Sequence, residues 1–388
     1  QACSHETYMD CPFYEQLAYV GDTRLEILTT YIMTPDDRLA RSSIELFDFS
    51  RFQWELVAEH YPSRTPQLSA TFSLIWISLV MDYAFWRDDE VFVKERMAGV
   101  RSTLEQFRLM LGPQGLLEQL PGWSFVDWAL GWKGGNARTS SQGISSINNL
   151  FLVQALRQAA LVEDALGENR LADRNRELAV ELSERIVRLF WDEKRKLIAD
   201  DIDHLYFSEH AQCLALLNGV LDNQKSMVCF ESLCAEKNLS IASIYFSFYL
   251  LEVFRQWGRG DLICQKLEFW NKLVAQGLKT PVECPEPARS DCHGWGSHPL
   301  FHMVTSLCGI RPLSFGFKTI EIAPAPGPLR HLECRVPHPQ GWISVDLHFA
   351  TSGTCQGTIS LPEKCLAYFR WRGKELILVC GENRPVNL

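Results

Sequence analysis

Three acidic residues stand close together near the start of the chain, namely Asp10, Glu15 and Asp22. Pro12 suits a loop or the first turn of a helix, and a helix that begins there would place Asp22 two turns after Glu15 on the same face. Carboxylates held close together raise the pKa of at least one of them, which keeps a carboxylic acid protonated for general acid catalysis. The same spacing also fits a helix N-cap at Asp10 followed by solvated acids, and the spacing alone favours neither interpretation.

A second group of polar residues lies in the proline-rich segment 280–299. Because prolines fix a loop at little entropic cost, such a segment can hold a catalytic base in place. Glu283 and Glu286 are the candidate bases. The alternative is a surface loop with two solvated acids, and composition alone favours that alternative.

A third unusual segment, residues 122–143, contains Trp123, Trp128 and Trp132 together with five glycines. This composition is poor for a helix, and ligand contacts concentrate in loops that a rigid scaffold carries. Aromatic rings can stack on the apolar face of a sugar, although most of the aromatic residues of a chain fill its core. The composition favours a ligand-binding loop over a loop folded onto its own aromatic side chains.

The overall composition restricts the class of ligand. The chain has 388 residues, 46% of them hydrophobic and 22% charged, which is ordinary for a globular protein and excludes general disorder. Its formal net charge is −9, and the longest basic run is the short segment 194–196. A nucleic acid or an anionic membrane is therefore not expected as a partner, whereas a neutral sugar is compatible with this charge.

The thirteen cysteines are scattered and odd in number, which is typical of reduced, buried thiols rather than a disulfide framework. Cys292 and His293, followed by His298 and His302, come nearest to a metal-ligand spacing. No second cluster completes four ligands, so no metal site is predicted.

The first residues, beginning at Gln1, contain neither a basic segment nor an apolar one, so no signal peptide is visible. Together with the reduced thiols, this favours a cytoplasmic location, unless a segment before Gln1 carried a signal. Two apolar stretches, 68–81 and 241–254, are shorter than the ~20 residues that span a bilayer. Buried helices explain both stretches better than membrane spans do.

The elements that must position these residues are mostly helices. Apolar residues recur at helical spacing from about residue 14 to residue 310. We expect helices at residues 38–60, 69–86, 91–111, 146–161, 171–191, 210–221, 241–257 and 261–278, and about eleven or twelve in all. Several are apolar on more than one side, which is typical of a helix inside a larger helical array.

The pattern changes near residue 312. Apolar residues then alternate with a period of two, as in 317–322 and 342–349, and a turn at Arg372-Gly373 interrupts a later run of β-forming residues. We therefore expect a mainly α chain. A helical catalytic domain would cover residues 1–312, and a small antiparallel β-sandwich domain would cover residues 313–388.

At this point the sequence resembles a known family. The run DCPFYEQLAYVGD at residues 10–22 resembles the signature of the α-L-rhamnosidases of glycoside hydrolase family 78. Segments 280–295, 123–128 and 316–324 resemble later segments of the same family, so that the matches reach from residue 10 to residue 324. The first motif is specific, whereas the last is shared with several sugar-active families.

The resemblance implies an (α/α)6 barrel followed by a small β domain, and an inverting hydrolase that releases terminal α-L-rhamnose. Glu15 would protonate the glycosidic oxygen, and Glu283 would deprotonate the attacking water. Inversion needs about 6.5–9.5 Å between the two carboxyl groups. Glu283 is preferred to Glu286 as the base because of its spacing from Thr280.

The resemblance also implies the residues that hold the sugar. Asp10 and Asp22 would bind rhamnose hydroxyls and the developing positive charge, and Asp127 and His293 would hold further hydroxyls. The ring and its methyl group would pack against Trp123, Trp128, Trp132 and Trp295. The substrate would be a rhamnosylated small-molecule glycoside or oligosaccharide, and no metal or organic cofactor is implied.

Two other interpretations are open. The chain could be another carbohydrate-active enzyme on an α/α barrel, such as a related glycosidase or a polysaccharide lyase. The acidic residues around Glu15 disfavour the uronate substrate of a lyase. Family members usually carry β-sandwich domains before the barrel, whereas nine residues precede Asp10 here, so the chain could also be an inactive sugar-binding remnant.

Overall fold

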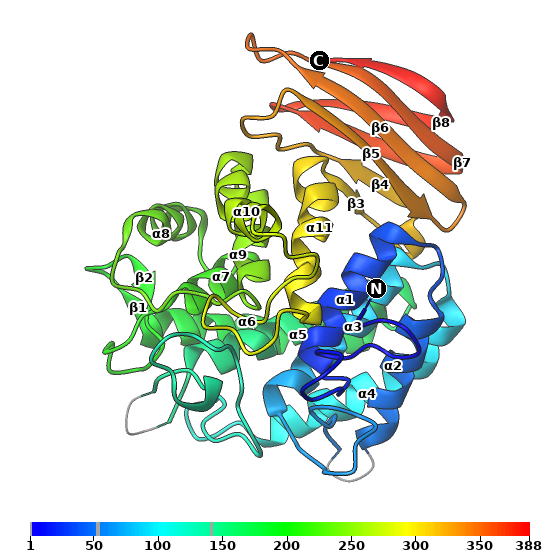
Figure 1. Ribbon diagram of the computed structural model, residues 1–388. Coiled ribbons are helices and arrows are strands. Elements are labelled where there is room, and N and C mark those ends of the chain that lie inside the picture. The colour runs from blue at the N-terminus through cyan, green and yellow to red at the C-terminus, as the bar shows by residue number, and fades with distance from the viewer. Residues whose placement is uncertain (1, 52–54, 140–142) are drawn as a thin grey trace.

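The computed structural model describes residues 2–51, 55–139 and 143–388. The described residues form a helical part with a β-sheet at one end of it (Figure 1). Its eleven α-helices are α1 (Val20–Met33), α2 (Arg38–Ser50), α3 (Ala70–Trp86), α4 (Glu90–Leu109), α5 (Ser146–Ala165), α6 (Asn169–Phe190), α7 (Glu209–Leu217), α8 (Asn223–Ala235), α9 (Ser247–Gln256), α10 (Gly260–Ala275) and α11 (His298–His302).

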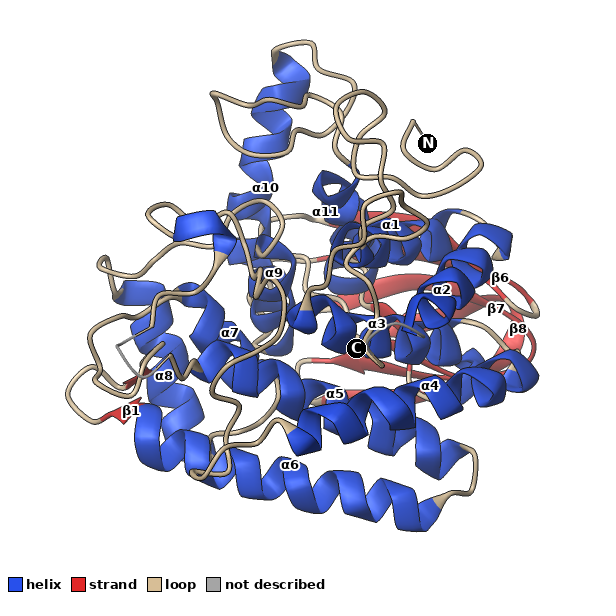
Figure 2. Cartoon of the chain, turned by 90° about the horizontal axis from the view of Figure 1, so that it is seen from below, coloured by secondary structure: helices blue, strands red, loops and turns tan. Residues whose placement is uncertain are grey.

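Helix α3 lies at the centre of the helical part. It is apolar on nearly every side and almost wholly buried, and it packs against α1, α4 and α5. Its N-terminus is capped by Ser69, whose hydroxyl accepts a hydrogen bond from the backbone N–H of Phe72. Helices α5 and α6 pack side by side beyond it (Figure 2). The helix predicted at residues 69–86 is therefore confirmed.

Two predicted helices are shorter than expected. The prediction for residues 38–60 is wrong in its second half, because α2 ends at Ser50 and Ala58 and His60 form strand-like bridges to other segments; Phe52 lies outside the described residues. The prediction for residues 241–257 is wrong at its start, because α9 begins only at Ser247.

The sheet contains β3 (Ile310–Pro312), β4 (Thr319–Ile322), β5 (His331–His338), β6 (Gly341–Phe349), β7 (Cys355–Trp371) and β8 (Lys374–Asn387). Its strand order is β3-β4-β7-β6-β5, and β8 pairs along β7. Irregular pairing between Ile359 and Leu366 divides β7 into a part that pairs with β6 and a part that pairs with β4. Such an irregularity bends a strand, so the sheet is curled.

One pairing in this sheet departs from the antiparallel expectation. Strands β4 and β7 are parallel, whereas the other pairs are antiparallel. The parallel pair is possible because the β5–β6 hairpin separates β4 from β7 in the chain. The turn predicted at Arg372-Gly373 is confirmed, since both residues have positive φ and connect β7 to β8. A two-residue ladder of β1 (Trp191–Asp192) and β2 (Leu197–Ile198) lies among the helices.

The sheet is fastened to the helical part by a buried aromatic contact and an ion pair. Phe317 packs against Trp86 of α3 with 5.1 Å between ring centroids, and Arg311 of β3 pairs with Glu252 of α9. Of the helices in the described ranges, none has the length and apolar character needed to cross a membrane.

Candidate active site

A cavity of about 390 Å³ opens where the segment before α1 meets the loop that precedes α11. Eight of the ten predicted site residues line it, namely Asp10, Glu15, Asp22, Trp123, Trp128, Glu283, His293 and Trp295. The other two, Asp127 and Trp132, do not line it. Phe72 and Phe125 extend its aromatic wall.

The loop that carries Glu15 is closed by Asp10. The backbone N–H of Leu17 donates to the Asp10 carboxylate over 2.9 Å, and the backbone N–H of Asp10 donates to the carbonyl of Leu17 over 2.9 Å. Gln16 has a positive φ of 59°, which an α-helix cannot accommodate. The helix expected from Pro12 is therefore wrong: α1 begins at Val20, and Glu15 stands on a loop before it.

A buried carboxylate–imidazole pair joins the two polar segments. Asp22, in the first turn of α1, lies 3.1 Å from Nε2 of His293. Burial raises the pKa of Asp22 to about 6, although the hydrogen bond from His293 opposes the rise. Burial alone would lower the pKa of His293, but its hydrogen bond and attraction to Asp22 raise it instead. The hydrogen bond therefore favours an ion pair between a negatively charged Asp22 and a protonated His293 in the cavity wall.

The two predicted catalytic glutamates face the same arginine. Nη2 of Arg289 lies 2.6 Å from Oε1 of Glu15 and 3.4 Å from Oε1 of Glu283. These two oxygens are consequently at most 6.0 Å apart, the sum of 2.6 and 3.4 Å. Both side chains keep contact with solvent, at 30% exposure for Glu15 and 12% for Glu283.

The second candidate base is placed differently. Glu283 is held by its backbone, whose N–H donates to Ser290 and whose carbonyl accepts from Nε1 of Trp295 over 2.9 Å. Glu286 is exposed and does not line the cavity. Its carboxylate accepts a hydrogen bond from the backbone N–H of Ala288, within its own loop.

Asp127 and Trp132 lie behind the aromatic wall. The Asp127 carboxylate is fully buried and accepts hydrogen bonds from Nε2 of His210 and from the backbone N–H of Ser243, each over 2.7 Å, and also from the Ser243 hydroxyl. These bonds hold residue 243 outside α9, which explains the late start of that helix. Trp132 packs on His210 with ring centroids 4.4 Å apart.

Replacement of Asp127 by alanine is expected to lower the free energy of unfolding by about 3–5 kcal/mol, because it leaves buried donors of His210 and Ser243 unpaired. Urea unfolding measures this change. The matched control is Asp203→Ala, which removes an exposed carboxylate and should stay within about 0.5 kcal/mol of the wild type. An Asp127→Ala protein of unchanged stability that has lost sugar affinity would instead support direct contact with the sugar.

Seven cavity residues had no role in the sequence prediction: besides Phe72, Phe125, Cys284 and Pro287, they are Tyr19, Glu59 and Arg289. Glu59 reaches the cavity because the backbone N–H of Val20 donates to its carbonyl over 3.0 Å, which pairs two segments that are distant in the chain. Its side chain is 1% exposed, and its Oε2 has no hydrogen-bond partner among the residues that the structure describes. Burial, reinforced by Asp22 and Glu15, raises the pKa of Glu59 to about 8. The raised pKa favours the protonated carboxyl of Glu59, which can donate a hydrogen bond inside the cavity.

Glu59 should make stability depend on pH. Above pH 4.5 the unfolded chain releases the Glu59 proton, whereas the folded protein keeps it up to about pH 8. The free energy of unfolding contributed by this group therefore falls by about 1.4 kcal/mol for each pH unit across that window. Urea unfolding of the wild type and Glu59→Gln should show the variant gaining relative stability from pH 5 to pH 8. Parallel pH profiles would contradict the raised pKa.

Hydrogen bonds within the cavity wall make its side chains poor ligands for a metal ion. Asp10, Cys11 and His293 each place one donor atom within 4.8 Å of the others. The Cys11 thiol donates to the Asp10 carboxylate, and burial raises the pKa of the thiol, which disfavours the thiolate that a metal requires. Of the histidines noted in the sequence, His298 bonds to the carbonyl of Ile244 and His302 to Ser306.

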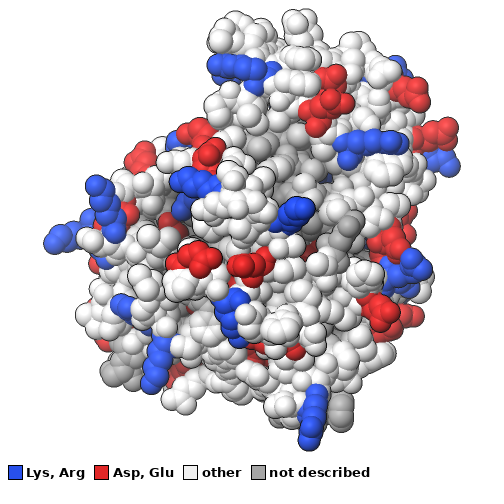
Figure 3. Space-filling model, in the orientation of Figure 1, with Lys and Arg blue, Asp and Glu red and all other residues white. Residues whose placement is uncertain are grey.

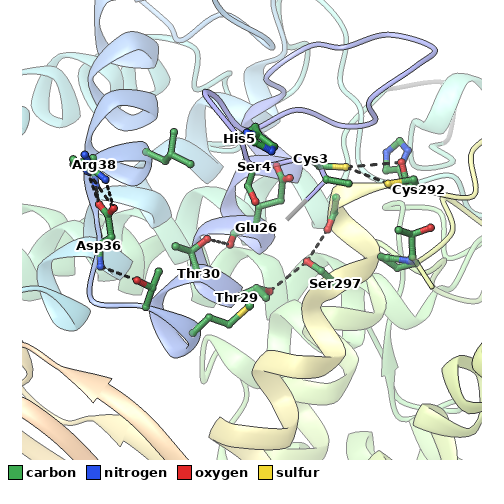
Figure 4. Close-up of a pocket in the computed structure, with 18 residues that line it drawn as sticks. Cys3, Ser4, His5, Glu26, Thr29, Thr30, Asp36, Arg38, Cys292 and Ser297 are labelled. Carbon is green, nitrogen blue, oxygen red and sulfur yellow. Dashed lines mark hydrogen bonds and ion pairs between the residues drawn. The ribbon is translucent and has the colours of Figure 1, made fainter.

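A larger cavity, of about 650 Å³, is also lined by His293. Figure 4 shows this larger cavity. It holds the buried carboxyl of Glu26, whose pKa is raised well above its usual value by burial, and the sulfurs of Cys3 and Cys292, 3.7 Å apart. Six of its eighteen lining residues carry hydroxyl groups, among them Thr29 and Ser297. The smaller cavity is the better candidate active site, because two solvent-accessible carboxylates and an aromatic wall meet there.

The family model of the bacterial α-L-rhamnosidase six-hairpin glycosidase domain matches residues 1–244. Among solved structures, the family 78 rhamnosidase of Bacillus sp. GL1 is 27% identical with a TM-score of 0.82, and the match covers 91% of this chain and 38% of that protein. The α-L-rhamnosidase of Aspergillus terreus is 13% identical with a TM-score of 0.81, covering 100% of this chain and 47% of that one.

A rhamnosidase of Klebsiella oxytoca, solved with rhamnose bound, is 19% identical with a TM-score of 0.67, and covers 78% of this chain and 60% of its own. The chain thus spans less than two thirds of the length of each of these three proteins. No curated protein sequence matches it. The family match covers well over half of the 388 residues, and the chain therefore belongs to the bacterial α-L-rhamnosidase six-hairpin glycosidase family.

Proposed function

We propose that the chain is the catalytic part of an inverting glycoside hydrolase that releases terminal α-L-rhamnose from glycosides or polysaccharides. The observation that carries this proposal is the meeting of Glu15 and Glu283 at one arginine, in a cavity with an aromatic wall. The family match and the rhamnose bound to the relative from Klebsiella oxytoca support rhamnose as the sugar.

Glu15 is proposed as the general acid and Glu283 as the general base. Glu15 gives a proton to the glycosidic oxygen as the bond to the anomeric carbon breaks, while Glu283 takes a proton from a water that attacks the same carbon from the opposite face. While no sugar occupies the cavity, the positive charge of Arg289 is shared between the carboxylates of Glu15 and Glu283. Binding of the sugar would have to break the ion pair between Arg289 and Glu15, because a general acid must carry a proton. The carboxyl groups of Glu15 and Glu283 would also have to reach the separation of about 6.5–9.5 Å that inversion needs.

The remaining cavity residues are proposed to hold the sugar. Asp10, Asp22 and His293 offer polar groups to the rhamnose hydroxyls, and the Asp22 carboxylate can stabilise positive charge that develops at the anomeric carbon. The ring and its methyl group would pack against Trp123, Trp128 and Trp295, which line the cavity. Because Asp127 and Trp132 are buried, we propose that they support this aromatic wall from behind.

A neutral glycoside fits this cavity better than an anionic polymer does. Acidic residues outnumber basic ones in its lining, which contains five carboxyl groups but only Arg289 and His293 as basic side chains. On the face seen in Figure 3, lysine and arginine side chains lie singly among acidic ones and form no continuous basic patch. Both features argue against a uronate polysaccharide or a nucleic acid as the ligand.

We propose further that the helices of residues 1–312 close as an (α/α)6 barrel and that residues 313–388 fold as a β-sandwich domain. The burial of α3 on nearly every side, and the six-hairpin description of the family, support the barrel. The irregular pairing within β7, which curls the sheet, supports the sandwich.

The test of the proposed function is the stereochemistry of hydrolysis. Proton NMR of 4-nitrophenyl α-L-rhamnopyranoside mixed with the protein should show β-L-rhamnose first, followed by the α-anomer through mutarotation. If α-L-rhamnose formed first, the reaction would be retaining and Glu283 would not be the base of a direct displacement.

A further inference from the structure

Three metal-binding side chains meet on the exposed face of the sheet, far in sequence from the cavity residues. His331 of β5 and His348 of β6 are directly opposite one another in the antiparallel register. Asp346 stands two residues before His348 and so projects from the same face. The three side chains are about half exposed, whereas Leu347 between Asp346 and His348 points into the core. Figure 1 shows β5 and β6 side by side.

The donor atoms of these residues are already close together. Nε2 of His331 lies 2.8 Å from Oδ1 of Asp346, and Nε2 of His348 lies 3.4 Å from the same oxygen. One donor atom of each residue lies within 4.8 Å of the other two. A tetrahedral zinc ion with bonds of about 2.0–2.1 Å keeps its ligand atoms about 3.4 Å apart. To bind one ion, the two imidazole rings would turn out of their stack until the lone pairs of both Nε2 atoms point to an ion beside the Asp346 carboxylate.

The pairing of the two strands restricts these side chains before any ion binds. The imidazole rings of His331 and His348 are stacked, with centroids 4.3 Å apart and an angle of 9° between planes. The backbone ladder runs from His331, the first residue of β5, to His338, and beyond His331 the backbone N–H of Phe349 donates to the carbonyl of Arg330 over 2.8 Å. Because the backbone already places the three side chains beside one another, binding requires changes in side-chain rotation only.

The charge distribution around the cluster also favours a cation. Glu333 lies directly opposite Asp346 on β5, and like charges in directly opposed positions repel one another. The next basic residue on that strand, Arg335, lies over the ring of Trp342, at 4.3 Å from its centroid. A bound dication would offset the repulsion between the two carboxylates.

We propose that His331, Asp346 and His348 form a surface site for a divalent transition-metal ion, with zinc as its representative. Two imidazoles and one carboxylate suit zinc and its neighbours in the first row, rather than magnesium or calcium, and water would complete the coordination. Since β5 is the last strand in the order β3-β4-β7-β6-β5, the ion would fasten this terminal strand to β6. The site is separate from the proposed rhamnose site, because the residues that line the rhamnose site lie between Asp10 and Trp295 in the sequence.

The test is a calorimetric titration of the untagged full chain with zinc chloride, with the thiols kept reduced. The variant is His348→Ala, which removes one ligand from an exposed position. The matched control is Thr358→Ala, on the neighbouring strand opposite Asp346, which removes no zinc ligand of the cluster. The wild type and the control should bind one more equivalent of zinc than His348→Ala, or bind that equivalent at least tenfold more tightly.

A second measurement separates this site from zinc binding by the thirteen cysteines. Zinc should raise the melting temperature of the wild type and of Thr358→Ala by several degrees, and raise that of His348→Ala clearly less. If the titrations and melting curves of all three proteins coincided with zinc present, the zinc would be held elsewhere and the proposal would be overturned. All three proteins should melt alike in the presence of a chelator, since the substituted side chains are outside the core.

Discussion

Replacement of Glu15 by glutamine is expected to lower kcat for rhamnoside hydrolysis by about 10²–10⁴-fold, which is the usual contribution of a general acid. Glutamine keeps the shape of the side chain and a donor toward the cavity, so the affinity for L-rhamnose should change little. The loss should be larger for an alkyl rhamnoside than for the 4-nitrophenyl rhamnoside, because nitrophenolate leaves with little help from an acid. Steady-state kinetics on both substrates measure the difference.

The control for this variant is Glu6→Gln, which changes an exposed acid in the same N-terminal segment. It should leave both rates unchanged. A Glu15→Gln protein that kept wild-type kcat on the alkyl rhamnoside would remove Glu15 from the role of acid.

Replacement of Glu283 by glutamine is expected to lower kcat by a similar factor of about 10²–10⁴ on both substrates. The attacking water needs its base whatever the leaving group, so the loss should not depend on the aglycone. This separates a base variant from an acid variant by kinetics alone. In the folded protein Arg289 keeps its partner Glu15, so the loop should remain in place.

Glu286→Gln is the matched control, because it makes the same change three residues away in an exposed side chain that does not line the cavity. It should retain wild-type kcat. If Glu286→Gln lost activity and Glu283→Gln kept it, the base would be Glu286, and the loop would have to rearrange when the sugar binds.

Local sequence patterns predict those helices and turns whose limits depend on residues close by in the sequence. The helix at 69–86 follows from its continuous apolar residues and its cap at Ser69, and the turn at Arg372-Gly373 follows from the β-forming residues around it. The start of α1 could not be predicted in this way. It depends on the hydrogen bonds between Asp10 and Leu17, which close a loop where a helix N-terminus was expected.

The same distinction holds for the site. The residues drawn from the two family-like segments 10–22 and 280–295 meet at one cavity, although more than 250 residues separate them. Glu59 was missed because the segment around it was predicted as a helix, whereas it pairs with residues 18–20 in an extended conformation. The burial of Asp127 depends on His210, which is 83 residues away, and no local pattern contains that information.

The most direct test of the account is a turnover measurement with the wild type on a panel of 4-nitrophenyl glycosides, with Glu15→Gln and Glu283→Gln beside it. The account predicts release of nitrophenolate from the α-L-rhamnopyranoside, with a kcat/KM at least a hundredfold above that for any other sugar of the panel, and loss of this activity in the glutamine variants. Faster hydrolysis of another glycoside, or no hydrolysis of any by the folded protein, would contradict it.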